Sequence, residues 1–395
     1  MRTMTMGNKI KVSLASFLAF FIISSILSPL GVVTGALVDE FGISLTYATA
    51  LFSYVTTGLL VGSFLILFLN PILGVKKVVL IAGFILILAL MSLGFISSAF
   101  WLPIVFFVMG LACGCLLSNA AITLTSTYSE RRRPSALLAT DSFYSAAGFI
   151  VTPIAGIVVA QGMHWSIIYS MAAAASLLMV LIVLFSHYPS EVNVGDDAPV
   201  VSDKTKWPLG TYFIGIAIAI YLTCFVFIYS WGPAYAEQSF EATEAQSGFI
   251  VSRFFLGLLL GQILTFVLSF RVKVSWVIFV TATAATLIST GIWASDTIAS
   301  MGLSMLLLGF SMGGLLKPLL AFGTLFLAKP TSRLVGFYML CMAVGSAISP
   351  ALSAFVVEMT SIKIVLTLVT VGFGLTTALI YISLFLMNKN SRQPS

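Results

Sequence analysis

Long apolar runs fill almost the whole of this chain and leave few folds open to it. Twelve runs can be separated at charged residues, Pro, Gly or Asn: residues 12–38, 46–69, 77–98, 100–128, 135–161, 164–187, 208–235, 243–270, 274–295, 297–328, 331–357 and 361–387. A helix needs about 20 residues to cross a bilayer core roughly 30 Å thick. The runs lack the alternation of a transmembrane β-barrel, and irregular backbone cannot face lipid. The sequence therefore predicts an all-α membrane protein with twelve transmembrane helices.

The composition also favours a location in the bilayer. Only 8% of the 395 residues are charged and 59% are hydrophobic, whereas soluble domains carry about 25% charged residues. A surface so poor in charge must face lipid. The net charge of +6 then reflects the orientation of the chain in the membrane and not the binding of nucleic acid. We expect the lipid bilayer as a partner and no nucleic acid.

The basic residues gather in alternate loops. With the N-terminus inside, cytoplasmic segments hold sixteen of the Lys and Arg residues, and external loops hold only Lys363. The external loops carry acids instead: Asp39, Glu40, Glu237, Glu241, Glu244, Asp296 and Glu358. This asymmetry follows the positive-inside rule for an even number of spans. We therefore expect both termini in the cytoplasm of a bacterium and a multi-pass protein of its inner membrane.

Two features divide the chain into halves. The only long polar stretch, residues 188–207, separates the sixth and seventh runs. The motif Gly-Leu-Leu-Val-Gly at 58–62 recurs as Gly-Leu-Leu-Leu-Gly at 257–261, and Gly-x-x-x-Gly at 110–114 recurs at 309–313, both 199 positions later. An offset of six helices indicates parallel repeats. We predict an N-terminal six-helix bundle (1–187), a cytoplasmic linker (188–207) and a C-terminal six-helix bundle (208–395).

Cytoplasmic motifs and one membrane segment carry a family resemblance. Gly74-Val-Lys-Lys77 follows the second span and Glu130-Arg-Arg-Arg133 precedes the fifth. Together with the two halves, they make the chain resemble the major facilitator superfamily along its whole length. Thr-Asp-Ser-Phe-Tyr-Ser-Ala-Ala-Gly at 140–148 and Ser-Trp-Gly-Pro-Ala-Tyr-Ala at 230–236 resemble, more narrowly, the TsgA-like branch of the fucose/galactose/hexose–proton symporter group.

The resemblance implies a secondary transporter that alternates access by rocking its two halves. Lys76 and Lys77, with Arg131 and Arg132, correspond to the cytoplasmic gate clusters of the family. Pro71 stands where the family usually has the Asp of the first cluster. The proton-linked acids of the sugar symporters are also missing at the matching positions, so sugar–proton symport is not implied.

Three charged residues lie well inside the spans: Asp141, Arg253 and Lys317. Such residues cost about 2.5–3.5 kcal/mol each at a helix centre, so they are rare without a partner or a function. Counting along the spans places Arg253 and Lys317 near mid-depth. We predict that they share a cavity and bind an anionic substrate group, for instance a carboxylate. The alternatives are a structural partner for Arg253 and a snorkelling Lys317. Pro318 is expected to loosen its helix.

Asp141 allows two interpretations. It lies about six residues into its span, near the arginine cluster, and could be a gate carboxylate that pairs with those arginines. It could equally be the proton-coupling group, because a carboxylate binds a proton when desolvated and releases it when a cation approaches. In the family that the chain resembles, the first, fourth, seventh and tenth spans line a central cavity and the second, fifth, eighth and eleventh flank it. Four further polar residues on such spans are candidate substrate contacts, with helix-to-helix hydrogen bonds or packing as the alternative: Tyr54, Asn119, Tyr144 and Tyr229.

The sequence predicts a secondary active transporter of a small solute, most simply an organic anion, moved with protons by symport. The alternatives are an exporter of a neutral or cationic compound, a sugar symporter, and a transport-inactive membrane sensor. We expect a monomer and no cofactor, because no Walker loop, dinucleotide fingerprint or metal-ligand spacing is present. We also expect no enzyme, because no nucleophile is paired with a base.

Overall fold

The computed structural model describes residues 5–129, 133–188, 207–268, 271–327 and 332–390. Within these ranges no strand occurs, and twelve helices are long and apolar enough to cross a membrane. This confirms the predicted fold class. The elements are α1 (Met6–Leu27), α2 (Leu30–Phe41), α3 (Leu45–Leu73), α4 (Val75–Ser92), η1 (Leu93–Phe95), η2 (Ala99–Trp101), α5 (Leu102–Thr127), α6 (Arg133–Ala160), α7 (Ser166–Leu184), α8 (Leu209–Phe240), α9 (Glu244–Leu268), α10 (Val274–Trp293), α11 (Ile298–Gly313), α12 (Leu316–Thr324), α13 (Ser332–Met359) and α14 (Ile362–Asn390).

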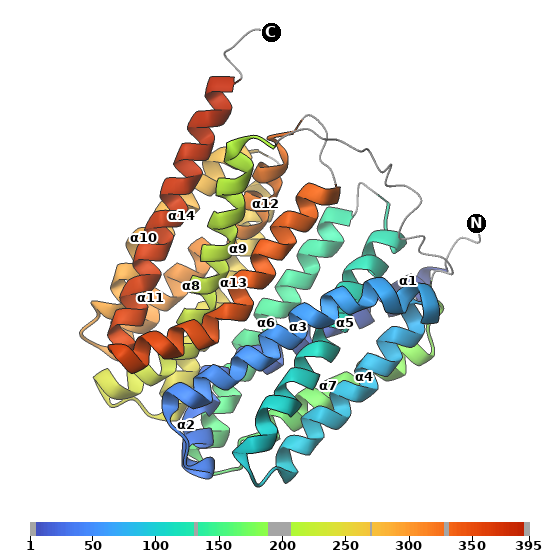
Figure 1. Ribbon diagram of the computed structural model, residues 1–395, viewed down its shortest axis with the longest axis vertical. Helices are drawn as coiled ribbons and strands as arrows, with labels where there is room; N and C mark the ends of the chain where they lie inside the picture. Colours follow the sequence, from blue (N-terminus) through green and yellow to red (C-terminus); the bar gives the residue numbers. More distant parts are fainter. Residues whose placement is uncertain (1–4, 130–132, 189–206, 269–270, 328–331, 391–395) are drawn as a thin grey trace.

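Two groups of helices form the molecule (Figure 1). Helices α1–α7 pack mainly among themselves and α8–α14 do the same, and the main contacts between the groups join α6 to α9, α3 to α13 and α2 to α8. We call these groups the N-half and the C-half. Helix α14 ends at the top of Figure 1 and α1 begins at its right, both on the upper right side of the molecule, and we call that side the terminal end. The predicted linker, 188–207, lies almost wholly outside the described residues.

The repeated glycine motifs are the places where helices of one half touch most closely. In the N-half, a Cβ added at Gly58 or Gly62 would overlap a carbonyl oxygen of α5. In the C-half, a Cβ added at Gly257 or Gly261 would overlap a carbonyl oxygen of α11. Small residues let membrane helices approach backbone to backbone, which is how they associate without a hydrophobic driving force. The repeat in the sequence therefore marks the same helix contact, made once in each half.

Two spans are broken within the bilayer. The first is divided into α1 and α2 at Ser28–Pro29, and the tenth is divided into α11 and α12 at Gly314–Leu315. The second break comes just before Lys317 and Pro318. Proline has no N–H and its ring clashes with the carbonyl group four residues earlier, here that of Gly314. This agrees with the loosening that Pro318 predicted, and it sets Lys317 in the first turn of α12.

Candidate functional site

Helix α6 presents a line of small and polar residues to the C-half. Asp141 Oδ2 lies 3.2 Å from Lys317 Nζ on α12, and one turn further along, Ser145 donates a 3.1 Å hydrogen bond to Gln262 Oε1 on α9. The next residue of the line is Gly148, where the side chain of Phe255 fills the space of a missing Cβ. The spacing of four and three residues keeps these positions on one face of the helix. This face forms much of the boundary between the halves.

The Asp141–Lys317 ion pair joins the two halves near the terminal end. Asp141 is eight residues from the start of α6 and Lys317 is seven residues from the end of α12, which puts each about 10–12 Å into the bundle at 1.5 Å per residue. The side chain of Asp141 is 18% exposed and that of Lys317 is 46% exposed. Because Lys317 points at the other half, its exposed part lies along the boundary between the halves.

Sequence reasoning placed both residues well inside spans but did not predict that they pair. Asp141 was expected to pair with the arginines at 131–133 if it had a structural role. Arg131 and Arg132, also predicted as gate residues, lie outside the described residues, and the partner that the structure gives Asp141 is Lys317. Charge balance could have predicted this pair. Asp141 is the only acid well inside a span, and a charge in such a place needs an opposite charge nearby.

The break between α11 and α12 is held in place by Tyr221 of α8. Its hydroxyl donates a 3.1 Å hydrogen bond to the carbonyl oxygen of Met312, and the Leu315 N–H bonds to the same oxygen at 3.0 Å. A backbone acceptor at a helix break within a membrane must find such partners, because no water is available to it. Tyr221 therefore fixes the α12 turn that carries Lys317.

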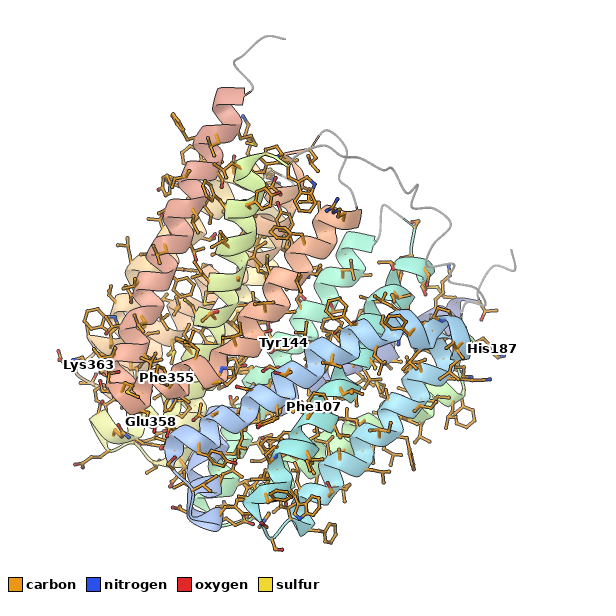
Figure 2. All side chains as sticks on the ribbon, in the orientation of Figure 1. Phe107, Tyr144, His187, Phe355, Glu358 and Lys363 are labelled. Carbon is orange, nitrogen blue, oxygen red and sulfur yellow. The ribbon has the colours of Figure 1, made fainter. Side chains whose placement is uncertain are left out.

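Two of the predicted substrate contacts, Tyr144 and Tyr229, belong to an aromatic cluster between the halves. The ring of Tyr144 on α6 is 6.3 Å from that of Phe255 on α9, and Tyr229 on α8 is 6.4 Å from the same ring. Figure 2 shows Tyr144 near the middle of the view, where the two halves meet. Tyr144 is one turn from Asp141 along α6. The cluster therefore borders the ion pair, on the side away from the terminal end.

The structure does not bring Arg253 and Lys317 together. The guanidinium group of Arg253 lies over Gly302 of α11, where an added Cβ would overlap Nη1. Gly302 precedes Lys317 by fifteen residues along α11 and α12, which is about 22 Å of helix. The geometry therefore differs from the predicted site, in which both cations bind one anion. Counting residues missed this because it fixed the height of each backbone and not the direction of the side chains.

Tyr54 and Asn119 lie apart from the ion pair. Tyr54, the counterpart of Arg253 at the 199-residue offset, is 46% exposed. Asn119 is fully buried and its Oδ1 accepts a 2.8 Å hydrogen bond from Asn70 Nδ2, which joins α5 to α3 inside the N-half. The alternative interpretation of Asn119, a bond between helices, is the one that fits this contact.

The predicted gate residue Lys76 contacts its own half. Its Nζ donates hydrogen bonds of 3.0 and 2.8 Å to the carbonyl oxygens of Leu184 and Ser186. These carbonyls lie at the last residue of α7 and just beyond it, where a cation is favoured by the helix dipole. Lys77 is exposed. Lys76 thus caps the C-terminus of α7. This contact is a reason for a lysine at this position in addition to the positive-inside rule.

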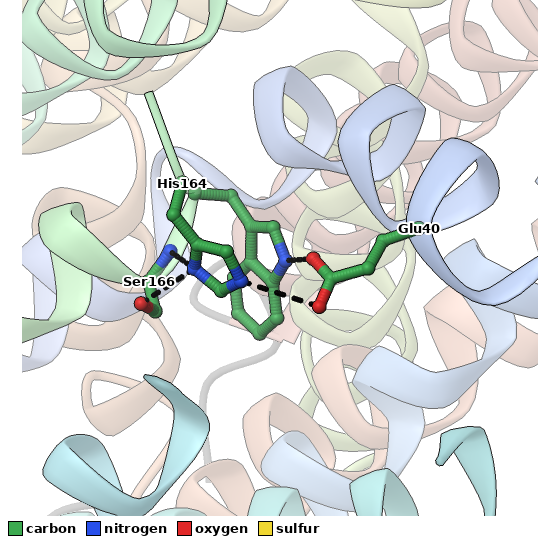
Figure 3. A network of polar contacts seen from close by, with 4 residues as sticks. Glu40, His164 and Ser166 are labelled. Atoms are coloured by element: carbon green, nitrogen blue, oxygen red, sulfur yellow. Dashed lines mark hydrogen bonds and ion pairs between the residues drawn. The ribbon is translucent and has the colours of Figure 1, made fainter. Parts of the chain in front are cut away.

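A second polar network, drawn in Figure 3, lies within the N-half where α2 ends and α7 begins. Glu40, in the last turn of α2, accepts a short hydrogen bond from the indole N–H of Trp165 and lies 3.2 Å from His164 Nε2. His164 Nδ1 is in turn 2.7 Å from Ser166 Oγ. This network ties the end of α2 to the loop between α6 and α7. In the sequence, Glu40 stands out only as one of the acids of the external loops, and His164 is not singled out.

Comparisons with known proteins agree with this architecture. Residues 12–240 match the model of the Major Facilitator Superfamily. Protein TsgA homologues are similar over most of the chain. That of Serratia proteamaculans is 26% identical over 346 residues, 87% of each chain. That of Edwardsiella ictaluri is 27% identical over 348 residues, 88% of each chain. That of Yersinia pestis (strain Pestoides F) is 28% identical over 348 residues, also 88% of each chain. The resemblance to TsgA-like proteins is thus confirmed.

Two solved structures share the fold. A bacterial homologue of the human lysosomal transporter Spinster, inward-facing and unoccupied, superposes with a TM-score of 0.75 at 11% identity, over 99% of this chain and 100% of that one. The nucleoside transporter NupG superposes with a TM-score of 0.68 at 15% identity, over 96% and 99%. At these identities the two likenesses show the fold alone. The family model is what makes the chain a multi-pass secondary transporter and not an enzyme. With the family model matching more than half of its length, the chain belongs to the Major Facilitator Superfamily.

Proposed function

We propose that this protein moves a small organic anion together with protons across the bacterial inner membrane, as a monomer whose two halves alternate access. The observation that carries the proposal is the Asp141–Lys317 pair, which joins α6 of one half to α12 of the other. Asp141 is the proton-binding group, and Lys317 is its counter-ion and the anchor of the substrate anion.

Charge balance favours proton and anion moving together. An unpaired charge inside a membrane protein is costly, so a site of this kind stays close to neutral. When a proton neutralises Asp141, the ammonium group of Lys317 loses its partner and can be neutralised by a carboxylate from the substrate. A cationic substrate at Asp141 would instead leave Lys317 unpaired. The pair therefore supports symport of a proton with an anion over transport of a cation.

The same pair couples binding to the movement of the halves. While Asp141 and Lys317 are bonded, α6 and α12 are held together near the terminal end. Protonation removes that bond, so this end can open only when the proton is bound. Tyr144, one turn from Asp141, and Tyr229, which meets the same Phe255 ring, supply the adjoining surface for the remainder of the substrate.

The test begins with purified wild-type protein and a thermal-shift screen of organic acids, sugars and cationic drugs. The acid that stabilises the protein is then used in proteoliposomes with an imposed pH gradient. We expect wild-type protein to accumulate it. We expect Asp141→Asn to lose accumulation driven by the gradient while retaining exchange of labelled for unlabelled substrate, and Lys317→Gln to lose both.

Glu358→Gln is the matched control, because Glu358 is an exposed acid at the end of α13, drawn near the edge of the molecule in Figure 2. It should transport normally. Normal accumulation by Asp141→Asn would contradict the coupling role. Stabilisation by cationic drugs alone would favour the exporter, stabilisation by sugars alone a sugar symporter, and binding without exchange in the wild type a sensor.

A further inference from the structure

Arg253 lies on the outer surface of the C-half, among side chains that face lipid. Helix α9 is covered on its other sides by α6, α8 and α11. The neighbours of Arg253 on the uncovered side are large and apolar: Phe249 and Leu260 on α9 are 50% and 45% exposed, and Leu303 on α11 is 55% exposed. Tyr54, its counterpart in the N-half, is exposed in the same way beside Val61, which is 40% exposed.

The guanidinium group is directed toward the end of the bundle opposite the termini. Side chains on a helix tilt toward its N-terminus, and α9 begins at that end. The Cα of Arg253 is nine residues from the start of α9, roughly 13 Å into the span. Its guanidinium group lies over Gly302, only four residues from the start of α11, roughly 6 Å into the span. The guanidinium group therefore lies nearer to that end of the bundle than its own Cα does, as in a snorkelling side chain.

Gly302 provides the notch in which the guanidinium group lies. A Cβ at this position would overlap Nη1 and would be 3.2 Å from both Cδ and Cζ of Arg253. Among the described residues the ion pairs are Glu40–His164 and Asp141–Lys317, so no acid of the described chain neutralises Arg253. A cation amid apolar, lipid-facing side chains needs an anion from outside the protein.

We propose that Arg253 binds the phosphate group of a phospholipid in the leaflet opposite the terminal end, with the acyl chains lying against the exposed apolar side chains of α9 and α11. The occupant follows from charge and position. Guanidinium groups bind phosphate oxygens in pairs, phosphate is the anion at this depth of a bilayer, and the flanking side chains are apolar. The site is distinct from the Asp141–Lys317 pair, which is about 22 Å away along α11 and α12.

The experiment is native mass spectrometry of the purified full-length protein in detergent, titrated with phosphatidylglycerol or with diacylglycerol, which lacks the phosphate. We expect wild-type protein to bind phosphatidylglycerol more tightly than diacylglycerol. Arg253→Gln should weaken phosphatidylglycerol binding by about fivefold, the effect of one basic residue at a membrane surface. Gly302→Val should weaken it likewise by displacing the guanidinium group. Lys363→Gln, which removes an exposed cation at the same end of the C-half, should bind as the wild type does.

The wild-type comparison of the two lipids tests the proposal even if a variant fails to fold. Equal binding of both lipids, or unchanged binding by a folded Arg253→Gln protein, would overturn it. Displacement of bound phosphatidylglycerol by glycerol 3-phosphate would also overturn the proposal, because the site would then take a soluble anion. Transport by the Arg253→Gln variant is a separate measurement. It depends on the Asp141–Lys317 ion pair and not on the proposed lipid site, so a failure of one proposal can be told from a failure of the other.

Discussion

Removing the charge of Asp141 should destabilise the protein more while Lys317 is present than after Lys317 has been neutralised. With the two charges 3.2 Å apart, Coulomb's law gives roughly 5 kcal/mol at an effective dielectric constant of about 20 and about 1 kcal/mol in bulk water. Because 46% of the Lys317 side chain is exposed, water screens the pair. We expect a coupling energy of about 1–2 kcal/mol, above that of exposed pairs and below the 3–5 kcal/mol lost when a buried pair is broken.

The measurement is a double-mutant cycle on unfolding in detergent, using Asp141→Asn, Lys317→Gln and the double variant. The two single variants should differ. Lys317→Gln leaves a carboxylate whose side chain is only 18% exposed, whereas Asp141→Asn leaves the better-solvated ammonium group, so Lys317→Gln should cost more. The double variant leaves no unpaired charge and should cost less than the sum of the two.

Additivity within about 0.3–0.5 kcal/mol is the behaviour of residues that do not interact. If the cycle gives additivity, the carboxylate and the ammonium group do not stabilise each other in the folded protein. Both the coupling energy and the proposed mechanism of proton–anion symport would then lose their basis. A repeat of the cycle at high salt checks the screening, since a partly exposed pair should weaken as the ionic strength rises.

Three further substitutions test the packing and the hydrogen bonds that position the site, each by thermal unfolding in detergent. Gly257→Val should destabilise the protein by about 1–3 kcal/mol because its side chain has no room against α11, whereas Gly336→Ala, which meets open space, should be neutral or slightly stabilising. Tyr221→Phe should cost about 0.5–1.5 kcal/mol by removing the bond to the carbonyl at the α11–α12 break. Trp165→Phe should cost about 1–2 kcal/mol by removing a donor from the Glu40 carboxylate.

Matched changes on exposed residues separate these effects from the general cost of substitution. Tyr212→Phe and Trp101→Phe alter side chains that are 42% and 54% exposed, and each should change stability by less than about 0.5 kcal/mol. If Tyr221→Phe or Trp165→Phe is as harmless as its control, the corresponding hydrogen bond does not stabilise the fold. Equal stability of Gly257→Val and Gly336→Ala would contradict the close contact of α9 with α11.

The sequence by itself determined the class of fold, the number of spans and the repeat. Twelve apolar runs of bilayer length admit only helices, because backbone polar groups in lipid must bond within their own segment. The recurrence of glycine pairs at a fixed offset indicated that a six-helix unit is repeated, and the structure shows that these glycines are where helices of each half touch. Pro318 likewise predicted the broken span, because the missing N–H of a proline disturbs the helix within one turn of that residue.

Only the tertiary structure decided which charges meet. Asp141 and Lys317 are on different halves, and nothing local in either segment encodes the distance between them. Arg253 and Lys317 are both cations within spans, but one points along α11 to the far end and the other across to α6. The direction of a side chain around its helix depends on which faces the neighbouring helices cover. Those neighbours are set by the packing of the whole bundle.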